Sequence, residues 1–221
     1  MVRKTTVPAP PQIRVLAGGN GAGKSSIGGA AIRAAGGEYY NPDEAARALR
    51  EANPGLGQTE VNAAAWDQGR RLLERAIDQR LDFTFETTLG GDTMTGLLAK
   101  AAKSGIEVHV FYIGLASADA HIERVRQRVR AGGHDIPEAD IRRRYRRSLI
   151  NLVHLLPVLT ELRVYDNSAT ADPATGQAPQ PVLVLHLQRG RIVGPSDLTS
   201  TPAWAKPIVG AGLELTMGRD R

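Results

Sequence analysis

The chain has 221 residues, with 28 Lys plus Arg against 23 Asp plus Glu and no cysteine. This length suits one α/β domain, the lack of cysteine excludes a disulfide framework or a thiolate metal site, and no apolar run is long enough to cross a bilayer. The first 12 residues contain no apolar segment of the secretory kind, so we expect a cytoplasmic protein. The modest excess of basic residues indicates a modest preference for anionic partners.

Strand and helix patterns alternate along the chain from residue 12 onward. Strands are predicted at 12–17, 38–41, 82–88, 106–115, 163–167 and 182–188. Helices are predicted at 24–35, from 42, at 58–80 with Thr59 as N-cap, and at 93–103, 117–130 and 137–162. Such alternation is typical of a three-layer α/β fold, with a mainly parallel sheet of about five to six strands covered on both faces.

A glycine-rich loop follows the first predicted strand and matches the pattern G-x4-G-K-[ST] at Gly18, Gly23, Lys24 and Ser25. In loops of this kind the backbone N–H groups surround the phosphates, the lysine reaches the β- and γ-phosphates, and the hydroxyl ligates Mg²⁺. A chance match is the alternative in a chain with 24 glycines, but the flanking strand and helix disfavour it. We therefore predict a site for ATP and Mg²⁺, with Ser25 as metal ligand, formed by Gly18, Gly19, Asn20, Gly21, Ala22, Gly23, Lys24, Ser25 and Ser26.

Two carboxylates follow predicted strands, where ligands bind in open parallel sheets. Asp43 lies just after the strand at 38–41, and Glu86 lies at the end of the strand at 82–88. Phosphoryl transfer to an alcohol needs a carboxylate near the acceptor hydroxyl. We expect Asp43 to be the base and Glu86 to orient the acceptor, with Thr87 and Thr88 nearby. The alternatives are a helix-start role for Asp43 and a surface role for Glu86.

Nine arginines fall within residues 124–147, which form two predicted helices joined by the break AGGHDIP. This arrangement is typical of a kinase lid that closes over ATP and neutralises the transferring phosphoryl group. Two alternatives are surface arginines paired with Glu123, Glu138 or Asp140, and a nucleic-acid-binding helix. The second is disfavoured because Tyr145 is the one aromatic residue in the block.

Several segments, in this order along the chain, resemble the zeta toxin family of P-loop kinases from bacterial toxin–antitoxin systems. They are GGNGAGKSS (18–26), NPDE (41–44), FETTLGG (85–91), the run from 124 to 152, and YDNS (165–168). The resemblance implies a P-loop kinase domain at residues 12–193 with its lid at about 124–147. Residues 1–11 would be a flexible lead-in, and residues 194–221 a C-terminal tail whose packing is not indicated.

The resemblance also implies an activity, the ATP-dependent phosphorylation of a sugar hydroxyl in a UDP-activated amino sugar such as UDP-N-acetylglucosamine. Asp43 would be the base, Glu86 would contact the sugar, and Arg128 and Arg144 would stabilise the γ-phosphate. Asp166 and Asn167 would lie near the adenine. A separate antitoxin protein is the implied partner. Because the chain is compact, the acceptor could instead be another UDP-sugar or an unrelated alcohol.

Overall fold

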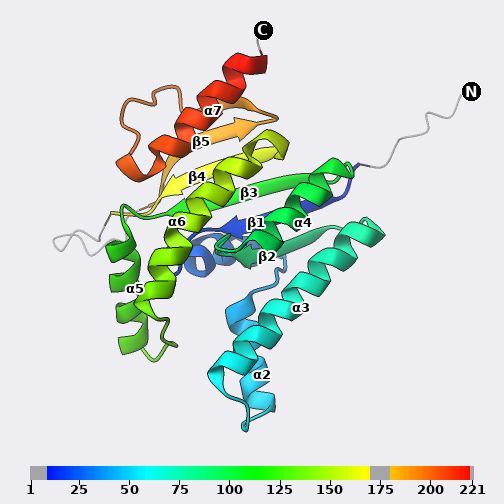
Figure 1. Cartoon of the computed structure of the whole chain (residues 1–221), viewed down its shortest axis with the longest axis vertical. Coiled ribbons are helices and arrows are strands. Elements are labelled where there is room, and N and C mark those ends of the chain that lie inside the picture. The colour runs from blue at the N-terminus through cyan, green and yellow to red at the C-terminus, as the bar shows by residue number, and fades with distance from the viewer. Residues whose placement is uncertain (1–8, 170–179, 220–221) are drawn as a thin grey trace, which may run out of the picture.

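The computed structural model describes residues 9–169 and 180–219, which build one six-stranded sheet between helices (Figure 1). The strand order across the sheet is β2-β1-β3-β4-β5-β6. The strands are β1 (Gln12–Ala17), β2 (Phe83–Thr87), β3 (Glu107–Gly114), β4 (Glu161–Asp166), β5 (Val182–Gln188) and β6 (Arg191–Gly194). The first four strands in this order are parallel, β5 runs antiparallel to β4, and β6 runs antiparallel to β5. The predicted α/β fold with a mainly parallel sheet is therefore confirmed.

Helices cover both faces of the sheet. On one face α3 (Gln58–Gln79), α4 (Asp92–Lys103), α6 (Glu138–Leu155) and α7 (Lys206–Arg219) form a layer in front of the strands in Figure 1. On the other face lie η1 (Lys24–Gly29) and its continuation α1 (Ala30–Ala34), and there Gly28 packs on the side chain of Leu16. The remaining helices flank these layers, with α2 (Pro42–Ala52) against α3 and α5 (Ala118–Arg130) against α6.

The main core lies between the sheet and the α3–α4–α6–α7 layer. Alternate residues of β1 point into it, and Ile13 and Val15 are fully buried there because strand side chains alternate between the two faces. Leu73, Leu98 and Leu152 come from three of the covering helices and belong to the same cluster. Since the parallel strands all end at one edge, the loops that follow β1 and β2 meet at that edge.

Three predicted elements differ from the structure. The strand at 38–41 is not formed, because only Tyr40 bridges to Phe85 and the Asn41 side chain already caps α2. The helix predicted at 58–80 is present as Gln58–Gln79, but its N-cap is Gly57 and not Thr59, and the Gly57 N–H donates to Glu60 Oε2 at 2.8 Å. The helix expected to reach residue 162 ends as an α-helix at Leu155, since a short turn with a proline near its start, η2 (Leu156–Val158), follows directly.

The C-terminal segment packs on the body of the protein. The strand β6 pairs with β5, and α7 covers β6 after the short turn η3 (Ala203–Ala205). Trp204 lies against Tyr112 with ring centroids 6.2 Å apart, and Ile208 is fully buried. Most of the expected lead-in at 1–11 and nearly all of the proline-bearing stretch at 169–180 lie outside the described residues.

Candidate active site

The glycine-rich loop forms a cradle between β1 and η1. Its first residue, Gly18, has a φ of +139°, and a Cβ there would lie 2.1 Å from the backbone oxygen of Ile113 in β3. Backbone cannot move out of the way as a flexible side chain can, so this position requires glycine. The loop therefore passes directly over the neighbouring strand before it enters the helix.

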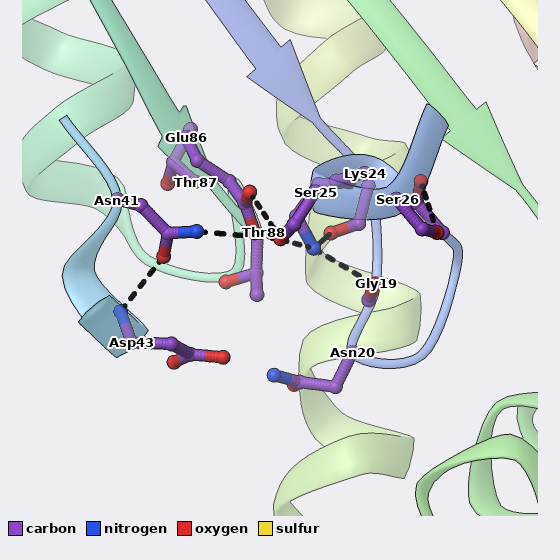
Figure 2. Close-up of polar contacts among 12 residues, drawn as sticks. Gly19, Asn20, Lys24, Ser25, Ser26, Asn41, Asp43, Glu86, Thr87 and Thr88 are labelled. Atoms are coloured by element: carbon purple, nitrogen blue, oxygen red, sulfur yellow. Dashed lines mark hydrogen bonds and ion pairs between the residues drawn. The ribbon is translucent and has the colours of Figure 1, made fainter. Parts of the chain in front are cut away.

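Lys24 and Ser25 turn toward one carboxylate, as Figure 2 shows. The buried Lys24 Nζ donates to the backbone oxygens of Gly18 at 2.9 Å and Gly19 at 3.0 Å, and lies 3.6 Å from Glu86 Oε1. Ser25 Oγ donates to Glu86 Oε2 at 2.8 Å. Glu86 is only 8% exposed. Its carboxylate therefore lies buried against Lys24 and Ser25, the two residues that the sequence assigns to ATP and Mg²⁺.

Asp43 lies in the first turn of α2 with its side chain 47% exposed. Its N–H donates to the Asn41 side chain at 2.9 Å, so the helix-start geometry expected as the alternative is present. Its carboxylate lies 3.6 Å from Arg128 Nη1 and 3.9 Å from His134 Nε2, both from the arginine-rich part of the chain. In Figure 2 the side chains of Asp43 and Asn20 point toward one another across open space. The helix start thus holds a partly exposed carboxylate beside Arg128 and His134.

Two cavities meet at these residues. The first, of about 460 Å³, lies over the loop and is lined by Lys24 and Ser25 and, from the far side, by Arg124, Arg128 and Asn167. The second, of about 640 Å³, lies between α3, the start of α4 and the lid, and is lined in part by Trp66 and His134. Both volumes lie in the range of small-molecule sites. The residues that line both cavities are Asn20, Pro42, Asp43, Glu86, Thr87 and Thr88.

Most arginines of the block at 124–147 pair with acidic side chains at the surface. The pairs are Arg126–Glu138, Arg130–Glu123, Arg142–Asp119, Arg143–Asp140 and Arg147–Asp92. Arg143 also lines the second cavity. Such pairing offsets much of the positive charge that a nucleic-acid-binding helix would need. The surface alternative is therefore correct for most of these residues.

Three arginines turn toward the site. Arg128 lies near Asp43 and its Nη2 donates to the backbone oxygen of His134 at 3.1 Å, and Arg144 Nη1 donates to Asn20 Oδ1 at 3.4 Å. The third, Arg124, was not selected from the sequence, although its spacing of four residues puts it on the same helix face as Arg128. Its Nη2 donates to the backbone oxygen of Asn167 at 2.6 Å. Arg124 and Arg128 therefore line the first cavity, and Arg144 lines the second beside Asn20.

The side chain of Asn167 contacts the glycine-rich loop. Its Nδ2 donates to the backbone oxygen of Ala22 at 2.9 Å, so the buried amide holds the glycine-rich loop while it lines the first cavity. Asp166 accepts hydrogen bonds from the Ser168 backbone at 3.2 Å and from Trp204 Nε1 at 3.2 Å. The first of these forms an Asx turn, a local structural contact of the Asp166 side chain.

The oxygen donors fit a magnesium ion brought in by a nucleotide. Ser25 Oγ and the Glu86 carboxylate are adjacent, and Mg²⁺ is usually held by one or two protein oxygens, phosphate oxygens and water. Among residues 9–169 and 180–219, no group of three or more His, Asp or Glu side chains is arranged to hold a metal ion by itself. In the same part of the chain, no helix is both long and apolar enough to pass through a bilayer.

Comparison with known proteins gives one family and several related structures. A family model described as zeta toxin matches residues 2–172. An uncharacterized protein of Haemophilus influenzae is 31% identical over 134 residues, which are 58% of this chain and 88% of that protein.

Two solved structures share the fold at low identity. A chain of AvrRxo1-ORF1:-ORF2 with ATP has a TM-score of 0.59 and 16% identity over 92% of this chain, which spans 64% of that longer chain. A chain of the PezAT toxin–antitoxin system of Streptococcus pneumoniae has a TM-score of 0.53 and 14% identity, over 98% of this chain and 90% of that one. At such identities the likeness shows a shared fold.

Proposed function

The chain belongs to the zeta toxin family of P-loop kinases, and from that premise we propose that it transfers the γ-phosphoryl group of ATP to a sugar hydroxyl of a UDP-activated amino sugar such as UDP-N-acetylglucosamine. The observation that carries the proposal is the junction of the two cavities at Asp43 and Glu86. The first cavity lies over the phosphate-binding loop, and the second has room for another small molecule. A kinase needs both, side by side, with a carboxylate between them.

In this proposal ATP lies in the first cavity with its phosphates on the loop. The backbone N–H groups of residues 18–23 bind the β-phosphate, and Lys24 gives up its contacts with loop carbonyls to bind the β- and γ-phosphates. Mg²⁺ would be held by the Ser25 hydroxyl and phosphate oxygens, and it would offset negative charge on the transferring group. Glu86 accepts a hydrogen bond from Ser25 and would orient that hydroxyl. Since it lines both cavities, it would also contact the acceptor.

The acceptor hydroxyl would sit at the junction, within reach of Asp43. The carboxylate takes the hydroxyl proton while the oxygen forms a bond to the γ-phosphorus, and the bond to the bridging oxygen of ADP breaks. Arg128 would exchange its contact with Asp43 for the γ-phosphate, and Arg144 would approach from α6. Their guanidinium groups would stabilise the negative charge on the transferring group. The protonated Asp43 would then release its proton to solvent, since the side chain is partly exposed.

The second cavity offers an acceptor both polar groups and a flat surface. Thr59, Asn62 and Trp66 line it from one side of α3, and the Trp66 side chain is 46% exposed. An indole ring open to a cavity can stack on a nucleobase or on the apolar face of a sugar. This supports an acceptor that contains a nucleobase or a sugar ring, as a nucleotide sugar does.

The partner and the compartment are part of the same proposal. The PezAT structure is described as a toxin–antitoxin system, which supports a separate antitoxin protein as partner of this chain. ATP and nucleotide sugars are cytoplasmic metabolites, so the proposed activity places the protein in the cytoplasm.

The test is transfer of label from [γ-³²P]ATP with Mg²⁺ to UDP-N-acetylglucosamine, UDP-glucose, free N-acetylglucosamine or no acceptor. We expect label on UDP-N-acetylglucosamine and little on the free sugar. Label on another alcohol, or only on inorganic phosphate, would contradict the proposed substrate. Binding is followed separately by the fluorescence of Trp66, with Trp66→Phe as the control because the other tryptophan, Trp204, is buried.

A further inference from the structure

A buried histidine lies directly behind the phosphate-binding loop. His121, in the first turn of α5, is only 1% exposed, and its Nδ1 lies 2.7 Å from the backbone oxygen of Asn20. The two residues are 101 positions apart in the chain, so this contact joins the start of α5 to the loop. The proposed chemistry at Asp43 and the arginines makes no use of this side chain.

The ring of His121 is packed closely. A Cβ at Gly19 would lie 2.6 Å from the His121 Cε1 atom, so the loop backbone passes directly over the ring. The ring of Tyr145, from α6, also contacts it, with 5.4 Å between the ring centroids. His121 is thus held between the loop and the second lid helix, with little freedom to turn.

The histidine is neutral under ordinary conditions. Burial, helped by the nearby charges of Lys24 and Arg124 and opposed by the hydrogen bond to Asn20, lowers the pKa of His121 to about 4. A neutral imidazole carries one N–H, and a carbonyl oxygen can only accept, so the proton is on Nδ1. The ring therefore acts as a fixed hydrogen-bond donor and adds no charge behind the phosphates.

We propose that His121 is a positioning residue for ATP binding, which holds the Asn20 carbonyl turned away from the nucleotide. If that peptide rotated, a carbonyl oxygen would face the phosphates in place of an N–H group, and repulsion would replace a hydrogen bond. Asn20 also accepts from Arg144 of α6 through its side chain, so both lid helices hold the same loop residue. The inference uses the proposed function only in that the loop binds ATP.

The test compares two variants of nearly equal shape, His121→Asn and His121→Leu. The Asn amide nitrogen takes the place of Nδ1 and keeps the donor, whereas Leu removes it. With a fluorescent ATP analogue and Mg²⁺, we expect the Kd to rise tenfold or more in His121→Leu and by less than threefold in His121→Asn. The KM for the acceptor should change little in either variant. Thermal unfolding of both variants reports whether they fold.

A second perturbation keeps the test decisive if His121→Leu does not fold. Gly19→Ala pushes a methyl group into the ring, so it should raise the Kd for the ATP analogue at least tenfold. The double variant Gly19→Ala with His121→Asn should recover part of that loss, because Asn lacks the Cε1 atom, which is the atom nearest to the added methyl group at 2.6 Å.

Three results would overturn the inference. One is equal weakening of ATP binding by Asn and Leu, which would mean that the ring only fills space. Another is no weakening by either variant, and the third is no recovery in the double variant. Failure of the unaltered protein to bind the ATP analogue would instead refute the proposed function, and the inference with it.

Discussion

The pH dependence of the free energy of unfolding can be predicted from Glu161 on β4. Its carboxylate contacts two histidines and an arginine. Glu161 Oε2 lies 3.0 Å from His109 Nδ1, and Oε1 lies 2.8 Å from His186 Nε2 and 2.8 Å from Arg163 Nη2. These contacts join β3, β4 and β5 on the face of the sheet opposite the main core. The perturbation is Glu161→Gln, which keeps the shape and removes the charge.

The magnitude follows from the pKa of Glu161. Burial by itself would raise this pKa, but hydrogen bonds from His109 and His186 and the charge of Arg163 lower it from 4.5 to about 2. At about 1.4 kcal/mol per pKa unit, that difference contributes about 3 kcal/mol to the free energy of unfolding. Since the folded pKa is the lower one, the contribution is fully present above about pH 4.5 and is lost as the pH falls toward 2. About 2 kcal/mol of it should be gone at pH 3.

The assay is urea unfolding followed by circular dichroism at pH 6 and pH 3. The loss of unfolding free energy between these two pH values should be smaller in Glu161→Gln than in the unaltered protein by about 2 kcal/mol. Glu51→Gln, at an exposed position on α2, is the control and should lose as much as the unaltered protein. If Glu161→Gln loses as much as the control, then the contacts on β4 do not hold the carboxylate ionised.

Three further predictions concern the site. Gly18→Ala should destabilise the protein by about 3 kcal/mol and abolish ATP binding, because its methyl group would meet the backbone oxygen of Ile113. Thermal unfolding measures the stability, and an ATP titration measures the binding. Lys24→Ala should weaken ATP binding by about 2 kcal/mol and slow turnover, since a charged hydrogen-bond donor is lost, which calorimetry and steady-state kinetics measure together. Arg144→Ala should lower kcat about 100-fold, whereas Arg147→Ala, at a surface ion pair, should leave kcat near the original value, and equal effects would contradict the lid assignment.

The glycine-rich loop could be predicted because its residues are consecutive and its geometry is local. The alternating strands and helices likewise showed the fold class, and the carboxyl-end rule placed Glu86 at the edge of the sheet where the loop lies. The sequence pattern did not show that Glu86 would lie against Lys24 and Ser25, because that contact depends on the register of β2 beside β1.

Other features depend on contacts that are distant in sequence. Acidic partners decide which arginines turn away from the site, and these partners, such as Asp92 and Asp119, lie up to 55 residues away in the sequence. The position of His121 behind Asn20 also arises only when α5 packs on the loop. The helix α7 was not predicted because apolar residues and glycines surround its axis, so no stripe of helical spacing marks it. The apparent strand at Tyr40 was wrong since Asn41 and Pro42 start a helix there.

The most direct test of phosphoryl transfer at this junction is a single-turnover measurement with Asp43→Asn. With labelled ATP, Mg²⁺ and the acceptor found by screening, transfer should slow by a factor of about 10² to 10⁴ while the Kd for ATP stays nearly the same. Glu44→Gln, at the next residue of α2 and paired with Arg33 at the surface, should transfer at the original rate. Transfer by Asp43→Asn at close to the original rate would contradict the assignment of Asp43 as the base between the two cavities.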